Sequence, residues 1–234
     1  MTSDPIDPTA FDHYAETYDQ SLNEGISVSG EDKTFFARAR IAWLAKHLCR
    51  FDFQPEVVLD FGCGTGSATP FFLELLRPRS VVGVDQSTAS LDRARREFGS
   101  SQVQFFPVDQ HLSSGRMDLA FCNGVFHHIP LLERPAAVRY VYTALRPGGL
   151  FAFWENNPWN PGTRFVMSRI PFDRDAITLS PPEARRLLRS EGFQIVRTDF
   201  LFIFPKFLRW FRALEPLVSR LPLGAQYQVL CRKP

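Results

Sequence analysis

The chain has 234 residues, of which 44% are hydrophobic and 22% are charged, and its formal net charge is +2. Such a composition is that of an ordinary globular protein long enough to bury a core, and the small net charge gives no reason to expect a nucleic-acid partner. The cysteines Cys49, Cys63, Cys122 and Cys231 have no paired spacing. This argues against a metal site or a disulfide framework and favours a reducing, cytoplasmic location.

The N-terminal part of the sequence carries no recognisable targeting segment. The stretch MTSDPIDPTAFDHYAE has neither the basic nor the apolar region of a secretory signal. No apolar run approaches the ~20 residues that a membrane span requires. Residues 11–48 are expected to be helical, because FFARARIAWLAKHL within them is amphipathic at helical spacing. We therefore expect a helical region over residues 1–50.

From residue 55 onward, short apolar runs alternate with helical stretches. The runs are bounded by turn-forming or charged residues, as strands are, and they cover residues 55–61, 80–85, 103–109, 117–123 and 149–155. The helical stretches between them cover residues 66–78, 87–99 and 131–149, the last ending at Pro147, Gly148 and Gly149. This alternation predicts right-handed crossovers and a parallel sheet that is buried on both faces.

The C-terminal part adds two more predicted strands, at residues 193–204 and 225–233, with residues 205–224 between them. No repeat or linker divides the chain, so we expect one domain over residues 1–234, with its core at 55–234. The predicted fold class is α/β: an open, doubly wound, mostly parallel sheet of seven strands, with an insertion between the last two.

The stretch VVLDFGCGTG, residues 57–66, places three glycines at alternate positions directly after a predicted strand. Bare backbone at such a turn lets a ligand approach closely, and the following helix presents its free N–H groups. Asp85 ends the next predicted strand, roughly 20 residues further on, where an acid can accept hydrogen bonds from ribose hydroxyls. Together these features indicate a cofactor that contains a nucleoside.

The third glycine, Gly66, comes one residue too early for the dinucleotide fingerprint G-x-G-x-x-G. LDFGCGTG resembles instead the first motif of the class I S-adenosylmethionine (SAM)-dependent methyltransferases. The resemblance continues in order along the chain through FDHYAETYD, VVGVDQS, PVDQ, FCNGVFHHI and LRPGGLFAFWE. It implies a Rossmann-like methyltransferase fold with a helical N-terminal lid. It also implies SAM as cofactor and methyl transfer that leaves S-adenosylhomocysteine.

The resemblance also implies which residues hold SAM. Those expected near its methionine part come from the first and fourth motifs and the first helix: Asp60, Gly62, Cys63, Gly64, Asn123, Gly124 and Arg38. Tyr14 and Tyr18 are expected in the lid that closes over the cofactor. Those expected near its adenosine part come from the second and third motifs: Asp85, Gln86, Asp109 and Gln110. Alternative roles stay open for some of them. Asp109 can be a solvated loop acid, and the two tyrosines can form a hydrophobic pair on one helix face.

Methyl transfer from a sulfonium asks the protein to hold the acceptor in line, to exclude water and, for hydroxyl targets, to take a proton. The candidate proton acceptors follow the fourth and fifth strands: His127, His128 and Glu155. His128 is preferred, because a histidine titrates near neutral pH. The alternative is that the HHIP stretch caps the next helix or shapes the pocket.

The loop ENNPWNPGTRF, residues 155–165, follows the fifth strand at the edge where this fold commonly holds its acceptor. Its polar and aromatic side chains are candidates for acceptor contact: Asn156, Asn157, Trp159, Asn160 and Arg164. The expected acceptor is a small molecule or a lipid- or sugar-linked compound. Two other functions stay open, an NAD(P)-dependent oxidoreductase and a non-catalytic SAM-binding protein.

The segment PKFLRWFRALEPLVSRLPLG, residues 205–224, begins with Pro205, a good first helical residue, and ends at Gly224. Pro216 is expected to break it into two short helices. The segment is rich in apolar residues at Phe207, Leu208, Trp210, Phe211 and Leu214, and in basic residues at Lys206, Arg209, Arg212 and Arg220. Two interpretations are open: a roof over the acceptor pocket, or a surface segment in weak, peripheral contact with anionic lipid.

Overall fold

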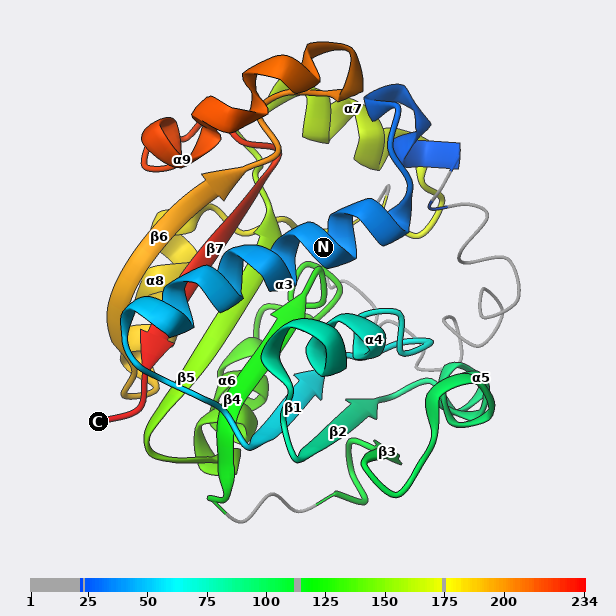
Figure 1. Ribbon diagram of the computed structural model, residues 1–234, viewed down its shortest axis with the longest axis vertical. Helices are drawn as coiled ribbons and strands as arrows, with labels where there is room; N and C mark the ends of the chain where they lie inside the picture. The colour runs from blue at the N-terminus through cyan, green and yellow to red at the C-terminus, as the bar shows by residue number, and fades with distance from the viewer. Residues whose placement is uncertain (1–21, 23, 112–114, 174–175) are drawn as a thin grey trace.

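The structure is a computed structural model that describes residues 22, 24–111, 115–173 and 176–234. Its centre is one sheet of seven strands in the order β3-β2-β1-β4-β5-β7-β6 (Figure 1). The strands are β1 (Val57–Phe61), β2 (Ser80–Asp85), β3 (Val103–Pro107), β4 (Met117–Asn123), β5 (Leu145–Asn156), β6 (Gln194–Leu201) and β7 (Gln226–Arg232). Strands β1 to β5 are parallel, and β7 runs antiparallel to both β5 and β6. The predicted fold class is confirmed.

Helices cover both faces of the sheet. The helical elements are η1 (Ser27–Ser29), α3 (Lys33–Arg50), α4 (Thr69–Phe71), η2 (Phe72–Leu76), α5 (Thr88–Phe98), α6 (Arg134–Ala144), α7 (Pro161–Arg169), α8 (Pro181–Ser190), η3 (Lys206–Leu214) and α9 (Glu215–Val218). Apolar residues of α3, η2 and α5 pack on one face, and those of α6 and α8 pack on the other. No helix in these described ranges is long and apolar enough to cross a membrane.

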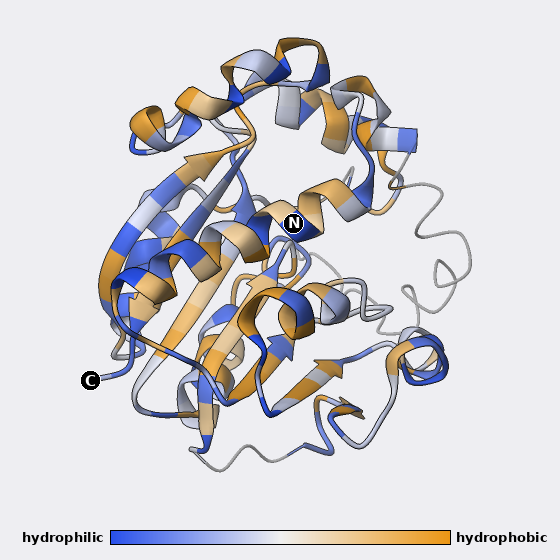
Figure 2. Cartoon of the chain, in the orientation of Figure 1, coloured by the Kyte–Doolittle hydropathy of each residue, from blue (hydrophilic) through white to orange (hydrophobic). Residues whose placement is uncertain are grey.

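The double burial of the sheet explains why its strands are continuously apolar. Val58 and Leu59 point to opposite faces of β1, and both are fully buried, each in a different apolar cluster. The central strands are accordingly hydrophobic along their length (Figure 2). Only a strand covered on both sides requires such a run, which is why the sequence signal was strong.

Three element boundaries differ from the sequence-based prediction. Helix α6 ends at Ala144, and Pro147, Gly148 and Gly149 lie within β5 rather than ending the helix. Leu145 is already extended, and the ladder between β4 and β5 shifts register where the Pro-Gly-Gly stretch intervenes, as at a β-bulge. The predicted helix over 66–78 is reduced to α4 and the π-helical η2. In the described part of the predicted helical region over 11–48, residues 24–26 and η1 are helical, the helix is interrupted at residues 30–32, and α3 begins at Lys33, after Asp32 accepts a hydrogen bond from Phe35 N.

The insertion between β6 and β7 consists of the 3₁₀-helix η3 and the short helix α9. The two helices meet at Leu214 and Glu215, so Pro216 lies in the first turn of α9, where proline is tolerated. Helix α9 ends at Val218, earlier than the predicted stop at Gly224. Figure 1 shows the insertion beyond the carboxyl ends of the parallel strands, next to α7.

Candidate active site

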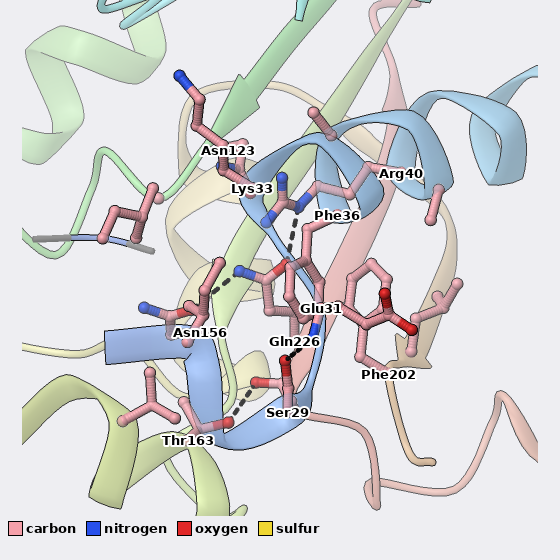
Figure 3. A pocket seen from close by; sticks show the side chains of 18 of the residues that line it. Ser29, Glu31, Lys33, Phe36, Arg40, Asn123, Asn156, Thr163, Phe202 and Gln226 are labelled. Carbon is pink, nitrogen blue, oxygen red and sulfur yellow. Dashed lines mark hydrogen bonds between the residues drawn. The ribbon is translucent and has the colours of Figure 1, made fainter. Parts of the chain in front are cut away.

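A cavity of about 490 Å³ lies at the carboxyl ends of β1 and β4 and is closed by α3, α7 and the insertion (Figure 3). Open α/β sheets bind ligands at this edge, where the strand order reverses. In this sheet the order reverses between β1 and β4. Strands β2 and β3 lie on one side of β1, and strands β4 and β5 lie on the other. The cavity therefore lies where the topology of the fold places a ligand site.

The glycine turn after β1 borders this cavity, and its three glycines have different reasons to be glycine. Gly62, Gly64 and Gly66 all adopt positive φ, at 72°, 51° and 78°. A Cβ on Gly62 would lie 2.3 Å from Val125, and one on Gly66 would press on Phe98. A Cβ on Gly64 would meet no atom within 4 Å. Gly64 lines the cavity and presents its bare backbone to open space there.

Asp85, at the end of β2, is tied to this turn. Its carboxylate accepts hydrogen bonds from Gly64 N at 2.8 Å and from Ser87 N at 2.9 Å. Each carboxylate oxygen can accept more than one hydrogen bond, so these two contacts by themselves do not saturate the carboxylate. All four predicted adenosine contacts lie outside the cavity lining: Asp85, Gln86, Asp109 and Gln110.

Two buried polar groups in the cavity suit a polar, cationic ligand. Asp60 is buried, and this burial, followed by the charge of Asp85, raises the pKa of its carboxyl to about 8. Asn123 Oδ1 is buried and has no hydrogen-bond partner within the described residues. Among these residues Asn123 therefore lacks a hydrogen-bond donor, and the neutral Asp60 lacks a positive charge that would favour its ionised form. A bound cationic ligand with a donor group would supply both. Both residues line the cavity, as do Gly62, Cys63, Gly64 and Gly124.

Arg38 does not take part in this site. It lies on the exposed side of α3, and its guanidinium pairs with Glu74 at 2.6 Å. Arg40, on the same helix, lines the cavity instead. Its Nε donates to Gln226 Oε1 at 2.8 Å, and Gln226 Nε2 donates to Asn156 Oδ1 at 3.0 Å (Figure 3). Tyr14 and Tyr18 lie outside the described residues.

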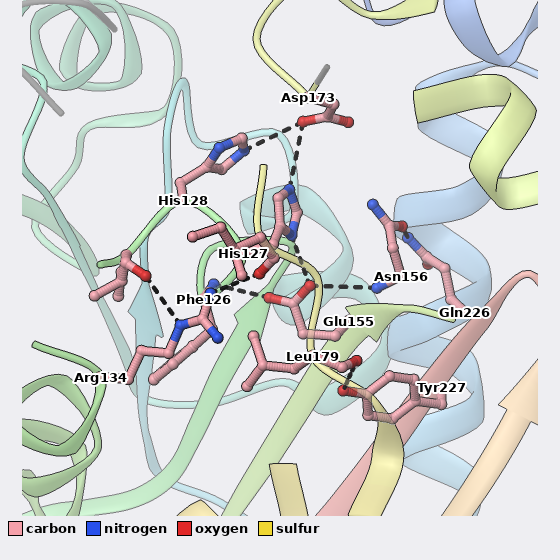
Figure 4. A network of polar contacts seen from close by, with 12 residues as sticks. Phe126, His127, His128, Arg134, Glu155, Asn156, Asp173, Leu179, Gln226 and Tyr227 are labelled. Carbon is pink, nitrogen blue, oxygen red and sulfur yellow. Dashed lines mark hydrogen bonds and ion pairs between the residues drawn. The ribbon is translucent and has the colours of Figure 1, made fainter. Parts of the chain in front are cut away.

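Beyond β4 and β5, a buried network joins the three predicted proton acceptors to Asp173 (Figure 4). Glu155 accepts hydrogen bonds from Phe126 N at 2.8 Å and from His127 Nδ1 at 2.6 Å. Asp173 Oδ1 lies 3.3 Å from His127 Nε2 and 3.2 Å from His128 Nε2. Asp173 follows α7, 46 residues beyond His127, and no feature of the sequence singled it out.

The charges of this network give its two histidines opposite properties. Burial alone would lower the pKa of His127, but the carboxylates of Glu155 and Asp173 outweigh it and raise the pKa to about 10. For His128, burial and the positive charge of His127 lower the pKa. His127 is therefore an imidazolium held between two carboxylates, whereas His128 is neutral near neutral pH. His127, His128 and Asp173 line the cavity, and Glu155 lies beneath them.

The acceptor-loop residues divide between the cavity and the framework. Asn156 lines the cavity, and so does Asn160, which also caps α7 by accepting from Thr163 N at 3.0 Å. Asn157 is fully buried, and its Nδ2 donates to the carbonyl oxygens of Pro222 and Gly224. It therefore fastens the loop to the end of the insertion.

Trp159 and Arg164 are not part of the cavity lining, and both side chains are exposed. The rest of the wall is largely apolar and contains several phenylalanines, among them Phe35, Phe36, Phe165, Phe172, Phe202 and Phe204. The concentration of phenylalanine near residue 200 was visible in the sequence, but its position against α3 was not. Phe36 and Phe202 are in edge-on contact, with ring centroids 4.9 Å apart.

The fold and the glycine turn define a class of α/β proteins that bind a nucleoside cofactor at the switch point of the sheet. The family model described as a methyltransferase domain matches residues 59–151, from β1 into β5. By this match and the order of its motifs, residues 59–151 are a methyltransferase domain of the class I SAM-dependent type, and the fold is shared with a solved SAM-dependent methyltransferase of Mesorhizobium loti.

Known proteins similar to this chain agree with that family. A trans-aconitate 2-methyltransferase of Deinococcus radiodurans is 33% identical over 98 residues, covering 41% of this chain and 36% of the relative. A carboxy-S-adenosyl-L-methionine synthase of Trichodesmium erythraeum is 30% identical over 45% of each protein. The chain thus spans less than half the length of these curated relatives. The solved 1,6-didemethyltoxoflavin-N1-methyltransferase of Burkholderia thailandensis shares the fold, with a TM-score of 0.61, 23% identity, and coverage of 100% of this chain and 93% of that one.

Proposed function

We propose that this chain transfers a methyl group from SAM to a small-molecule or lipid- or sugar-linked acceptor and releases S-adenosylhomocysteine. The observation that carries the proposal is that the glycine turn, Asp60, Asn123 and His128 all line the same cavity. A cofactor site and an acceptor chamber that open into each other are what a group transfer between two bound molecules requires. The activated methyl group is supplied by the sulfonium of SAM when it is bound.

The residues around the glycine turn suit the two ends of SAM. Asp60, Asn123 and the bare backbone of Gly64 fit its methionine part, since they offer an acid, an unpaired acceptor and open space. We assign the adenosine part to the strand ends beyond the cavity, with Asp85 facing the ribose. Arg38 receives no role in binding, because it pairs with Glu74 on the surface. Arg40 is the arginine of α3 that lines the cavity.

His128 is the proton acceptor that this arrangement supports. The contact between its Nε2 and Asp173 favours the tautomer protonated on Nε2, which leaves the lone pair on Nδ1. The low pKa of His128 keeps the ring neutral and ready to accept. His127 and Glu155 hold a fixed ion pair underneath, so we assign them a positioning role. Glu155 fixes the His127 ring, His127 orients Asp173, and Asp173 in turn orients His128.

The acceptor chamber favours an apolar or planar acceptor with a few polar groups. Phe36, Phe172 and Phe202 provide apolar walls, and the hydrogen-bonded row of Arg40, Gln226 and Asn156 provides a polar edge. Pockets of this kind gain affinity from apolar contact and orientation from a few polar groups. Among the loop residues, Asn156 and Asn160 keep a proposed acceptor role, whereas Asn157, Trp159 and Arg164 do not.

Calorimetric titration with SAM, S-adenosylhomocysteine and NADPH tests the cofactor. We expect the first two to bind and NADPH not to bind; the reverse result would support an oxidoreductase. Turnover is then measured as formation of S-adenosylhomocysteine with a panel of acceptors. The panel starts from trans-aconitate and 1,6-didemethyltoxoflavin, the compounds in the names of similar proteins. SAM binding without turnover on any acceptor would favour a non-catalytic SAM-binding protein.

A further inference from the structure

The insertion formed by η3 and α9 has an inner side that is engaged with the cavity. Glu215 Oε1 accepts hydrogen bonds from Ile203 N at 3.0 Å and from Phe204 N at 3.1 Å. Arg212 donates to Phe204 O at 3.0 Å and to Glu31 Oε1 at 2.9 Å. Phe204, Arg212 and Glu215 also line the cavity. These contacts hold the insertion in place and satisfy its inner polar groups.

The outer side of the same insertion is strongly apolar and exposed. Leu217 is 80% exposed, Trp210 78% and Phe207 75%. Four more large apolar residues between 205 and 224 are about half exposed: Phe211, Leu214, Leu221 and Leu223. These seven, together called the outer apolar face, are nearly half of the fifteen large exposed hydrophobic residues in the described part of the chain. Figure 2 shows the hydrophobic positions along this segment.

A single exposed leucine needs no explanation, but a concentration of this kind marks a surface that meets something apolar. Phe211 contacts Phe204, with ring centroids 5.8 Å apart, but no residue of η3 or α9 is buried, so packing inside this chain accounts for little of this apolar surface. Their identities narrow the choice of partner. Exposed tryptophan and phenylalanine along a short helix suit the boundary between lipid headgroups and acyl chains.

The charges on the insertion narrow the choice of partner further. Residues 205–224 contain four basic residues and one acid, Glu215. Glu215 is turned inward, whereas Lys206 and Arg209 are exposed on the same segment as the outer apolar face. Arg220 is also exposed, but its guanidinium donates to Thr198 O and pairs with Asp199. The Arg209 guanidinium lies 5.1 Å from the centroid of the Trp210 ring, which places charge and aromatic surface together. The exposed charge around the apolar face is therefore positive.

We propose that the outer apolar face docks on an anionic lipid bilayer, with its aromatic and leucine side chains in the interface and its basic side chains on the headgroups. A second copy of this chain fits the same surface less well. A two-fold interface through this face would bring the basic residues of the two copies together, and their repulsion would destabilise the dimer. An anionic bilayer would attract the same residues. This contact does not depend on the transferase proposal, because its residues lie outside the catalytic network.

Co-sedimentation with vesicles tests the docking. We expect the parent protein to bind phosphatidylcholine vesicles that contain about 30 mol% phosphatidylglycerol at low salt. Binding should fall at least tenfold in pure phosphatidylcholine, or at salt that shortens the Debye length to ~3 Å. The double variant Phe207→Asp/Trp210→Asp should abolish binding. Arg209→Glu should weaken it roughly fivefold or more, since each basic residue near the surface contributes about that factor.

The matched controls change similar residues elsewhere. Leu132→Asp alters an apolar residue that is 95% exposed, and Arg96→Glu reverses an exposed charge on α5. Both should bind vesicles as the parent does, and all variants should keep the parent's thermal transition. No binding of the parent to anionic vesicles at low salt would overturn the proposal, as would equal loss in the controls. A dimer in sedimentation velocity that the double variant dissociates, without vesicle binding, would identify a second copy as the partner instead.

Discussion

His127 Nδ1 and Glu155 Oε2 lie 2.6 Å apart in the interior of the protein, although 28 residues separate them along the chain. His127 follows β4 and Glu155 is the last residue but one of β5, so two neighbouring parallel strands bring them together. Asp173 closes the arrangement from the other side of the His127 ring, and His128 lies against the same carboxylate. A buried charge is tolerated only when it is paired in this way. The following predictions begin from this network.

Removing the charge of Glu155 should destabilise the fold. Glu155→Gln leaves His127 with one carboxylate partner in a buried site, and breaking such a pair costs about 3–5 kcal/mol in the free energy of unfolding. Urea denaturation measures this loss. The control is Glu74→Gln, which breaks the exposed pair with Arg38 and should cost less than ~1 kcal/mol. Equal losses in the two variants would contradict a buried ion pair at His127.

The network also predicts how stability depends on pH. The pKa of His127 is raised from 6.5 to about 10, so its contribution is complete below pH 6.5 and is lost as the pH rises through 10. The pKa of Asp173 is lowered from 3.8 to about 2, so its contribution is complete above pH 3.8 and is lost as the pH falls through 2. The network therefore stabilises the fold most between these limits.

NMR titration of the five histidines in the folded protein measures the first of these shifts. The ring of His127 should remain protonated well above neutral pH, while His128 should be neutral. A His127 resonance that titrates at its ordinary pKa would disprove the ion pair. In denaturation experiments, the free energy of unfolding should decline from neutral to alkaline pH less steeply in Glu155→Gln than in the parent.

Asp60 should release a proton when SAM binds. Its pKa of about 8 keeps most of its carboxyl groups neutral at neutral pH, and a cationic ligand nearby favours the ionised form. Affinity for SAM should therefore rise with pH up to about 8. Calorimetry at neutral pH in two buffers of different ionisation enthalpy counts the released proton. Asp60→Asn should bind without that release, and a parent that binds with none would remove Asp60 from the cofactor site.

Gly64→Val should abolish SAM binding and leave the protein folded. The new side chain would enter open space on the cavity side of the turn, where we place the cofactor. The measurement is the shift in melting temperature caused by SAM. Gly148→Val is the matched control, since Gly148 also has positive φ but lies in the β-bulge of β5. A full SAM-induced shift in Gly64→Val would show that the cofactor does not pass this turn.

His128 should affect turnover more than affinity. If it takes the acceptor proton, His128→Ala should lower kcat by about 10²–10⁴ while SAM binding stays close to that of the parent. His111→Ala serves as the control, because His111 stacks on Phe106 away from the cavity. Asp173→Asn should lower kcat less than His128→Ala and shift the pH–rate profile, because it acts by orienting His128. A kcat of His128→Ala within a few-fold of the parent would reduce the residue to a cavity wall.

The sequence by itself determined the fold class and the position of the glycine turn. Strands buried on both faces must be continuously apolar, and helices that cover them must repeat apolar residues at helical spacing, so the seven strands were visible as local patterns. The same holds for Gly62, Gly64 and Gly66, because a backbone with positive φ strongly favours glycine. Burial and backbone conformation act on each short segment separately, and a single sequence records them there.

Tertiary structure alone decided which candidate side chains meet. Arg38 and Arg40 are equivalent in the sequence, but the packing of α3 turns one to Glu74 and the other to the cavity. Asn156 and Asn157 are adjacent, yet one faces the cavity and the other fastens the insertion. The partner of His127 and His128, Asp173, comes from a loop after α7 that shows no pattern of its own. Contacts between distant segments depend on how whole elements pack against each other, and local patterns carry no record of that packing.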